Sequence, residues 1–229
     1  MGTGVCTVRT GHFAIEAGYN NTVTPGSGGG NTAAYGATLL RVGTGDPHLD
    51  FELTPPALED SSLGAALVTG SSDLGIGAKY ELGYTAKALW GINAEITVPS
   101  GTPAFSARLP QYIGNVNWGY ALNSTFGVNG TLGLNWLGAL GPSGAPQQYF
   151  AFIPTLEATA ALPGPSQLFV EYAYFSSTGI GTGAKSLIDG GYVRDLGTHV
   201  QIDVEYGISP TLVPSQRQHY FGAGISFMN

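Results

Sequence analysis

Alternation of apolar and polar side chains is the feature of this sequence that most restricts its fold. In the segment HVQIDVEYGI, residues 199–208, apolar side chains occupy every second position from Val200 to Ile208, and polar or small residues stand between them. Successive side chains of an extended strand point to opposite faces. The segment is therefore predicted to be a strand with one apolar and one polar face, and the class of fold depends on which face meets water.

The same alternation recurs along the chain in segments of roughly 9–11 residues, the length that a tilted strand needs to cross a membrane. About 12 such strands are expected, an even number as in closed bacterial barrels. In residues 33–42 either phase fits the pattern, and Arg41 is assigned to the polar face because an arginine facing lipid is costly. The other segments lie near residues 12–20, 48–53, 73–84, 90–97, 115–120, 128–136, 150–159, 167–174, 186–195, 199–208 and 219–227.

The connections between these segments alternate in length. Long connections rich in Gly, Pro and Ser lie near 22–31, 55–72, 99–111, 138–147, 176–184 and 209–217. Short connections lie near 43–47, 85–87, 122–124, 162–165 and 195–198. Long loops at one end and tight turns at the other are typical of outer-membrane barrels, and the long loops are then extracellular.

The composition indicates which face of the strands meets water. Charged residues are 10% of the chain, against about 25% in an ordinary soluble domain. Most of the 15 acidic residues fall in the polar phase, where on a lipid-facing exterior each would cost several kcal/mol. The polar phase is therefore assigned to a lumen, and the predicted pore-lining residues are Glu16, Arg41, Asp50, Glu52, Lys79, Glu81, Glu95, Glu157, Glu171, Asp189, Asp203 and Glu205. Aromatic residues of the apolar phase gather near both strand ends, as in the interfacial belts of membrane barrels.

These features predict one domain over residues 1–229, an all-β, transmembrane, antiparallel up-and-down β-barrel of about 12 strands with a polar lumen. Residues 1–11 are expected to form a loose N-terminal segment. The start of the chain lacks a basic stretch followed by an apolar core, so we interpret it as a mature form without its signal peptide.

Three stretches resemble a known family: TVPSGTPAF (97–105), LIDGGYVRDLGTHVQIDVEYGISP (187–210) and HYFGAGISF (219–227). They are similar to the outer-membrane transporter-like β-barrel family associated with phenol-degradation pathways. The resemblance extends loosely over almost the whole chain and is strongest in its C-terminal third. It implies a barrel of about 12 strands in a Gram-negative outer membrane and uptake of small hydrophobic or aromatic compounds. The chain departs from the usual insertion signal, which ends on an aromatic residue, because Met228 and Asn229 follow Phe227.

Other classes of function find little support. The net charge of −7 argues against nucleic-acid binding, and the single cysteine, Cys6, excludes a cysteine metal cluster. The four histidines are scattered over different segments, and no G-x-S-x-G, H-E-x-x-H or C-x-x-C motif occurs. We expect no enzymatic activity, no catalytic residues, no metal ligands and no cofactor.

The sequence thus favours a passive outer-membrane channel for small solutes with an acidic, cation-preferring lumen. Its expected partners are the lipid bilayer, small-molecule solutes and the outer-membrane assembly machinery. Two alternatives stay open at this point: a structural or adhesive barrel whose long loops bind partners, and a soluble ligand-binding β-barrel.

Overall fold

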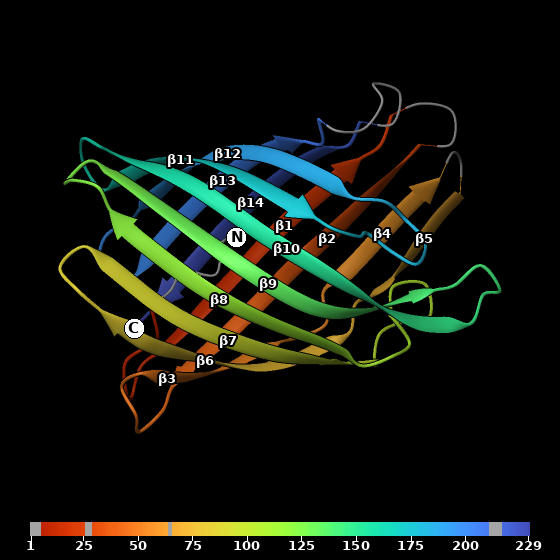
Figure 1. Cartoon of the computed structure of the whole chain (residues 1–229), viewed down its shortest axis with the longest axis horizontal. Coiled ribbons are helices and arrows are strands. Elements are labelled where there is room, and N and C mark those ends of the chain that lie inside the picture. The colour runs from red at the N-terminus through yellow and green to blue at the C-terminus, as the bar shows by residue number, and fades with distance from the viewer. Residues whose placement is uncertain (1–5, 26–28, 64–65, 211–216) are drawn as a thin grey trace.

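A computed structural model describes residues 6–25, 29–63, 66–210 and 217–229, and its strands join in one antiparallel sheet (Figure 1). The strands are β1 (Phe13–Val23), β2 (Gly30–Gly43), β3 (Leu49–Thr54), β4 (Leu58–Leu63), β5 (Ala66–Ser71), β6 (Leu74–Tyr84), β7 (Ala88–Val98), β8 (Gln111–Ala121), β9 (Phe126–Leu140), β10 (Pro146–Leu162), β11 (Ser166–Phe175), β12 (Lys185–Asp195), β13 (Val200–Ile208) and β14 (His219–Met228). Among the described residues, no helix is long and apolar enough to span a bilayer.

The sheet closes on itself because β1 pairs with β14 on one side and with β2 on the other. Strands β3 and β4 pair with successive parts of β2 and form one strand of the wall, as do β6 and β5 beside them. The fourteen segments therefore make a closed barrel of 12 wall strands, which confirms the predicted class of fold. Short turns and the C-terminus lie at one end of this barrel, and the longer connections lie at the other (Figure 1).

The polarity of the barrel is the reverse of that in a soluble protein. Large apolar side chains such as Phe51 and Val170 point outward and are 59% and 58% exposed. Asp50, Lys79 and Arg41 point inward and are buried. A soluble ligand-binding barrel would place its acids outside and its apolar side chains inside, so this alternative is wrong. The exterior fits hydrocarbon instead.

Aromatic pairs mark both ends of this apolar exterior. Phe13 and Phe227 lie beside the short turns with ring centroids 5.9 Å apart. Trp136 and Phe150 lie toward the long connections, 5.1 Å apart, and both are about half exposed. Rings with this placement suit the two levels at which lipid head groups meet the acyl chains.

The prediction that residues 55–72 form a long connection is wrong, because most of this segment forms the β4–β5 hairpin. The sequences LEDSSL and ALVTGS alternate too weakly to be recognised as strands, and their pairing depends on the free edge of β2. The long connection at 99–110 agrees with the prediction. It is held against the barrel by Asp73, whose carboxylate accepts hydrogen bonds from the backbone N–H groups of Ser100, Gly101 and Ala107.

Candidate functional site

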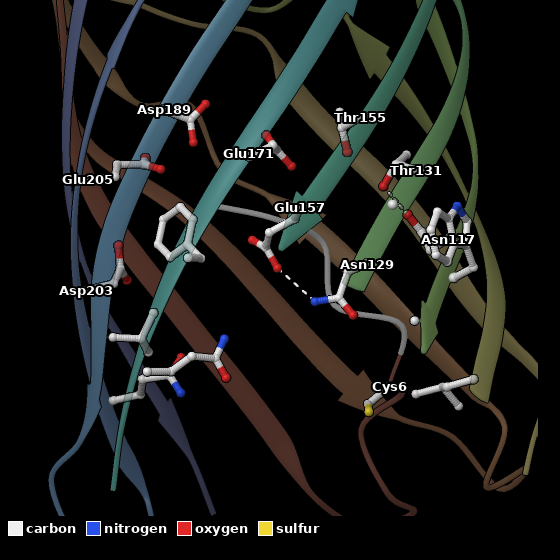
Figure 2. Close-up of a pocket in the computed structure, with 18 of the residues that line it drawn as sticks. Cys6, Asn117, Asn129, Thr131, Thr155, Glu157, Glu171, Asp189, Asp203 and Glu205 are labelled. Atoms are coloured by element: carbon white, nitrogen blue, oxygen red, sulfur yellow. Dashed lines mark hydrogen bonds between the residues drawn. The ribbon is translucent and has the colours of Figure 1, made fainter. Parts of the chain in front are cut away.

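Five carboxylates line one side of the lumen and are called here the acidic wall: Glu157, Glu171, Asp189, Asp203 and Glu205. They come from four neighbouring strands, β10 to β13. Figure 2 shows their side chains gathered on these strands and directed into the interior. Glu157 pairs across the strands with Glu171, and Glu171 with Asp189, so three acids stand in one row. Like charges placed directly opposite each other in a sheet are destabilising, which indicates a function for the row other than stability.

Glycines on the adjacent strands leave space for these acids. A Cβ atom at Gly207 would lie 2.7 Å from the Cβ of Asp189, and one at Gly224 would lie 2.5 Å from a carboxylate oxygen of Asp203. A Cβ at Gly222 would collide with the carboxylate of Glu205. The glycine-rich sequence of β14, HYFGAGISFM, thus gives the acidic side chains of β13 the room that they need inside the barrel.

The acidic wall faces a cavity of about 400 Å³. The opposite side of this cavity carries neutral polar groups, among them Asn117, Asn129 and Thr131 (Figure 2). Its described lining residues include no Lys, Arg or His. Among the described residues, the ionisable groups that line this cavity are therefore mostly acidic.

Members of the wall differ in their hydrogen bonding. Asn129 donates its side-chain N–H to Glu157 at 2.8 Å, and the hydroxyl of Tyr220 donates to Glu205 at 2.6 Å. Asp189 is only 7% exposed, and within the described part of the chain no hydrogen bond or ion pair reaches its carboxylate. A buried carboxylate that points into a cavity without a partner is well placed to meet a solute.

The two predicted basic residues of the lumen, Arg41 and Lys79, lie in a group called here the Arg41 cluster: Arg41, Lys79, Glu16, Asp50 and Glu52. The guanidinium of Arg41 lies 2.7 Å from Asp50, 3.5 Å from Glu52 and 3.6 Å from Glu16. The ammonium of Lys79 lies 3.5 Å from Glu52. Both cations are thus engaged with acids on the β1, β2, β3 and β6 side of the barrel, and of this cluster Glu16 also lines the cavity beside the acidic wall.

The N-terminal segment 6–9 lies inside the barrel near its short-turn end. The backbone N–H of Val8 donates to Asp50 at 2.9 Å, and Arg41 donates to the carbonyl of Cys6 at 2.6 Å. Val8 is 1% exposed. The prediction of a loose segment covered residues 1–11; residues 1–5 lie outside the described residues, and residues 6–9 contact the Arg41 cluster.

A second cavity of about 980 Å³ lies at the short-turn end. Cys6, Leu89 and Gln167 are among the residues that line both cavities, so the two spaces adjoin. Of the predicted lumen residues, Glu81 lines this second cavity and lies 3.4 Å from His48. Glu95 lies apart from both cavities and accepts a hydrogen bond from Thr54 at 3.2 Å.

The structure thus divides the predicted residues into the acidic wall, the Arg41 cluster and two separate acids. The sequence did not predict three apolar residues that line the first cavity: Phe169, Leu89 and Val193. Phe169 stands in the polar phase of β11, between Gln167 and Glu171, and this exception to the alternation was a signal that could have identified it. The ring of Phe169 lies over Gly191, where an added Cβ would come within 2.6 Å of it.

Comparisons with known proteins identify the fold. No protein-family model matches the sequence, and no curated protein sequence matches it. The chain is similar in structure to an outer membrane channel from Pseudomonas putida F1, with a TM-score of 0.75 and 14% identity over 100% of this chain and 99% of that one. It is also similar to the NanC porin, with a TM-score of 0.58 and 10% identity over 94% of this chain and 98% of the porin.

A third similar structure is the translocator domain of the autotransporter NalP from Neisseria meningitidis, with a TM-score of 0.59 and 14% identity over 96% and 90% of the two chains. The fold is that of outer-membrane barrels. Channels, porins and an autotransporter domain share it, so the function of this chain has to be argued from its own lumen.

Proposed function

We propose that this protein is a passive outer-membrane channel for small solutes, with a lumen that prefers cations. The observation that carries the proposal is the acidic wall, which faces a lumen cavity with no basic residue among its described lining. Rings or clusters of Asp and Glu lower the energy of a cation in a pore and raise that of an anion.

The position of Arg41 and Lys79 supports the same direction of selectivity. Arg41 and Lys79 are engaged with Glu16, Asp50 and Glu52, so their charges are largely compensated where they stand. Among the described residues, no Lys, Arg or His lines the cavity that the acidic wall faces. A permeating ion therefore passes more acidic than basic side chains on this side of the barrel.

The adjoining cavities supply a path from the acidic wall toward the short-turn end. The N-terminal segment 6–9 occupies part of this path and narrows it. The resemblance to the family associated with phenol-degradation pathways adds small aromatic compounds as candidate solutes, and the apolar residues Phe169, Leu89 and Val193 suit them. Liposome swelling across sugars, ions and simple phenols compares these solute classes directly.

Planar-bilayer recordings in asymmetric KCl test the cation preference. We expect a reversal potential of the sign given by K⁺ permeation, and a smaller one in Glu171→Gln and Glu157→Gln. Asp195→Asn is the matched control, because Asp195 lies on β12 but is exposed, outside the acidic cavity, and accepts a hydrogen bond from Gln201. Anion preference or the absence of conductance would refute the proposal. The adhesive alternative predicts instead that partner binding through the loops is the same in Glu171→Gln and the unmodified chain.

A further inference from the structure

We propose that the cavity beside the acidic wall is a binding site for small organic cations that carry an ammonium group on an aromatic or aliphatic body. This inference rests on the proposed channel function only in that the ligand reaches the cavity through the lumen. It goes beyond charge selectivity, because it assigns a stopping point within the path and a chemical class of ligand.

The charge of the ligand follows from Asp189 and its neighbours. Asp189 is only 7% exposed, and its side chain points into the cavity (Figure 2). Among the described residues, its carboxylate has neither a hydrogen bond nor an ion pair. Its cross-strand neighbour Glu171 adds a second carboxyl group, on a Cβ that in paired residues lies at about 5 Å from that of Asp189. A buried carboxylate in such a place is stabilised by an ion of opposite sign, and an ammonium group supplies both the charge and the hydrogen-bond donors.

The apolar body of the ligand follows from Phe169. Its ring lies over Gly191, and Gly191 pairs across the strands with Glu205, so an aromatic ring lies beside the acidic wall. Leu89 and Val193 line the same cavity. A cation above an aromatic ring is attracted by its quadrupole, and this attraction grows when water is excluded.

The same geometry disfavours a bare metal ion as the ligand. Among the described residues, no group of three or more His, Cys, Asp or Glu side chains converges closely enough to hold a metal ion. The cavity of about 400 Å³ falls within the range of small-molecule sites, which is roughly 300–1,000 Å³. A lining that combines carboxylates, neutral amides and apolar side chains suits an amphipathic cation better than a hydrated inorganic one.

Calorimetric titration of the refolded full chain in detergent tests the site with three probes. Benzylammonium carries both the charge and the ring, benzyl alcohol carries the ring alone, and methylammonium carries the charge alone. We expect benzylammonium to bind at least about tenfold more tightly than either of the others, because only it uses both halves of the site. Equal affinity for benzyl alcohol and benzylammonium would overturn the inference.

Variants locate the site. Asp189→Asn should weaken benzylammonium binding about tenfold or more, and Phe169→Leu about threefold to thirtyfold, as expected for loss of a partly desolvated cation–π contact. Asp195→Asn should bind like the unmodified chain. Should Asp189→Asn fail to fold, as judged by heat-modifiable migration in gels, Glu157→Gln replaces it with the same expectation. Unchanged affinity in a folded Asp189→Asn or Glu157→Gln chain would refute the site.

The outcomes separate this inference from the channel proposal. A cation-selective conductance without benzylammonium binding refutes the site and leaves the channel in place. Benzylammonium binding that is sensitive to Asp189→Asn, in a chain without conductance, supports the site and refutes the channel.

Discussion

Replacement of Arg41 by glutamine should strongly destabilise the barrel. Arg41 is 9% exposed and lies within 4 Å of three carboxylates, of which Asp50 is fully buried and Glu52 is 4% exposed. At an effective dielectric constant of about 20, the attraction across the 2.7 Å contact with Asp50 alone is about 6 kcal/mol. Desolvation of both groups offsets much of this attraction, so we expect the free energy of unfolding to fall by about 3–5 kcal/mol, the usual cost of removing one partner of a buried pair.

Urea unfolding in lipid vesicles, followed by the fluorescence of the three tryptophans, measures this change. Lys87→Gln is the control, because Lys87 lies exposed in the β6–β7 turn and should change stability by less than about 0.5 kcal/mol. In Arg41→Gln combined with Asp50→Asn, part of the loss should be recovered, since the double change removes an uncompensated buried charge. A loss of less than about 1 kcal/mol in Arg41→Gln would refute the reasoning that the Arg41 cluster is buried and mutually compensating.

Two further predictions concern the outer surface and the N-terminal segment. Val170 lies at an outward position of β11 and is 58% exposed. Val170→Arg should lower the free energy of unfolding in vesicles by up to about 2–4 kcal/mol, the cost of an arginine at the bilayer midplane. No loss of stability would contradict a lipid-facing β11. Val8→Asp places a carboxylate beside Asp50, and repulsion between the two acids should expel segment 6–9 from the lumen. Single-channel conductance should then be higher than in the control Thr10→Asp, whose position is exposed. Equal conductance in the two variants would show that the segment does not narrow the path.

The alternation of side chains predicted the strands of the barrel, whereas its polarity and the inward position of Arg41 were predicted from the cost of charged residues facing lipid. It acts locally, because the two faces of a strand are set by the period of two. The Arg41 cluster was beyond this pattern, since it depends on register: Arg41 pairs with Glu52, and Asp50 pairs with Lys79, across strands whose alignment no single segment specifies. The same holds for the row of Glu157, Glu171 and Asp189.

Other features were missed for different physical reasons. The β4–β5 hairpin pairs through its backbone with an edge of β2, and its side chains carry little periodic signal. The segment 6–9 is fixed by two hydrogen bonds, one from the N–H of Val8 to Asp50 and one from Arg41 to the carbonyl of Cys6; these partners are 42 and 35 positions apart, so composition cannot reveal them. The sequence shows that Phe169 is an apolar residue in the polar phase of β11. Only the position of its ring over Gly191 shows that this side chain lines the cavity.

The place of Cys6 between the two cavities has a practical consequence. It is the sole cysteine of the sequence, and it is exposed to the space inside the barrel rather than to lipid (Figure 2). Thiol reagents of graded size, added to one compartment at a time, would therefore label the native chain at a known depth. Cationic and anionic reagents of the same bulk would then report the local potential through their relative labelling rates, with no engineered residue in the protein.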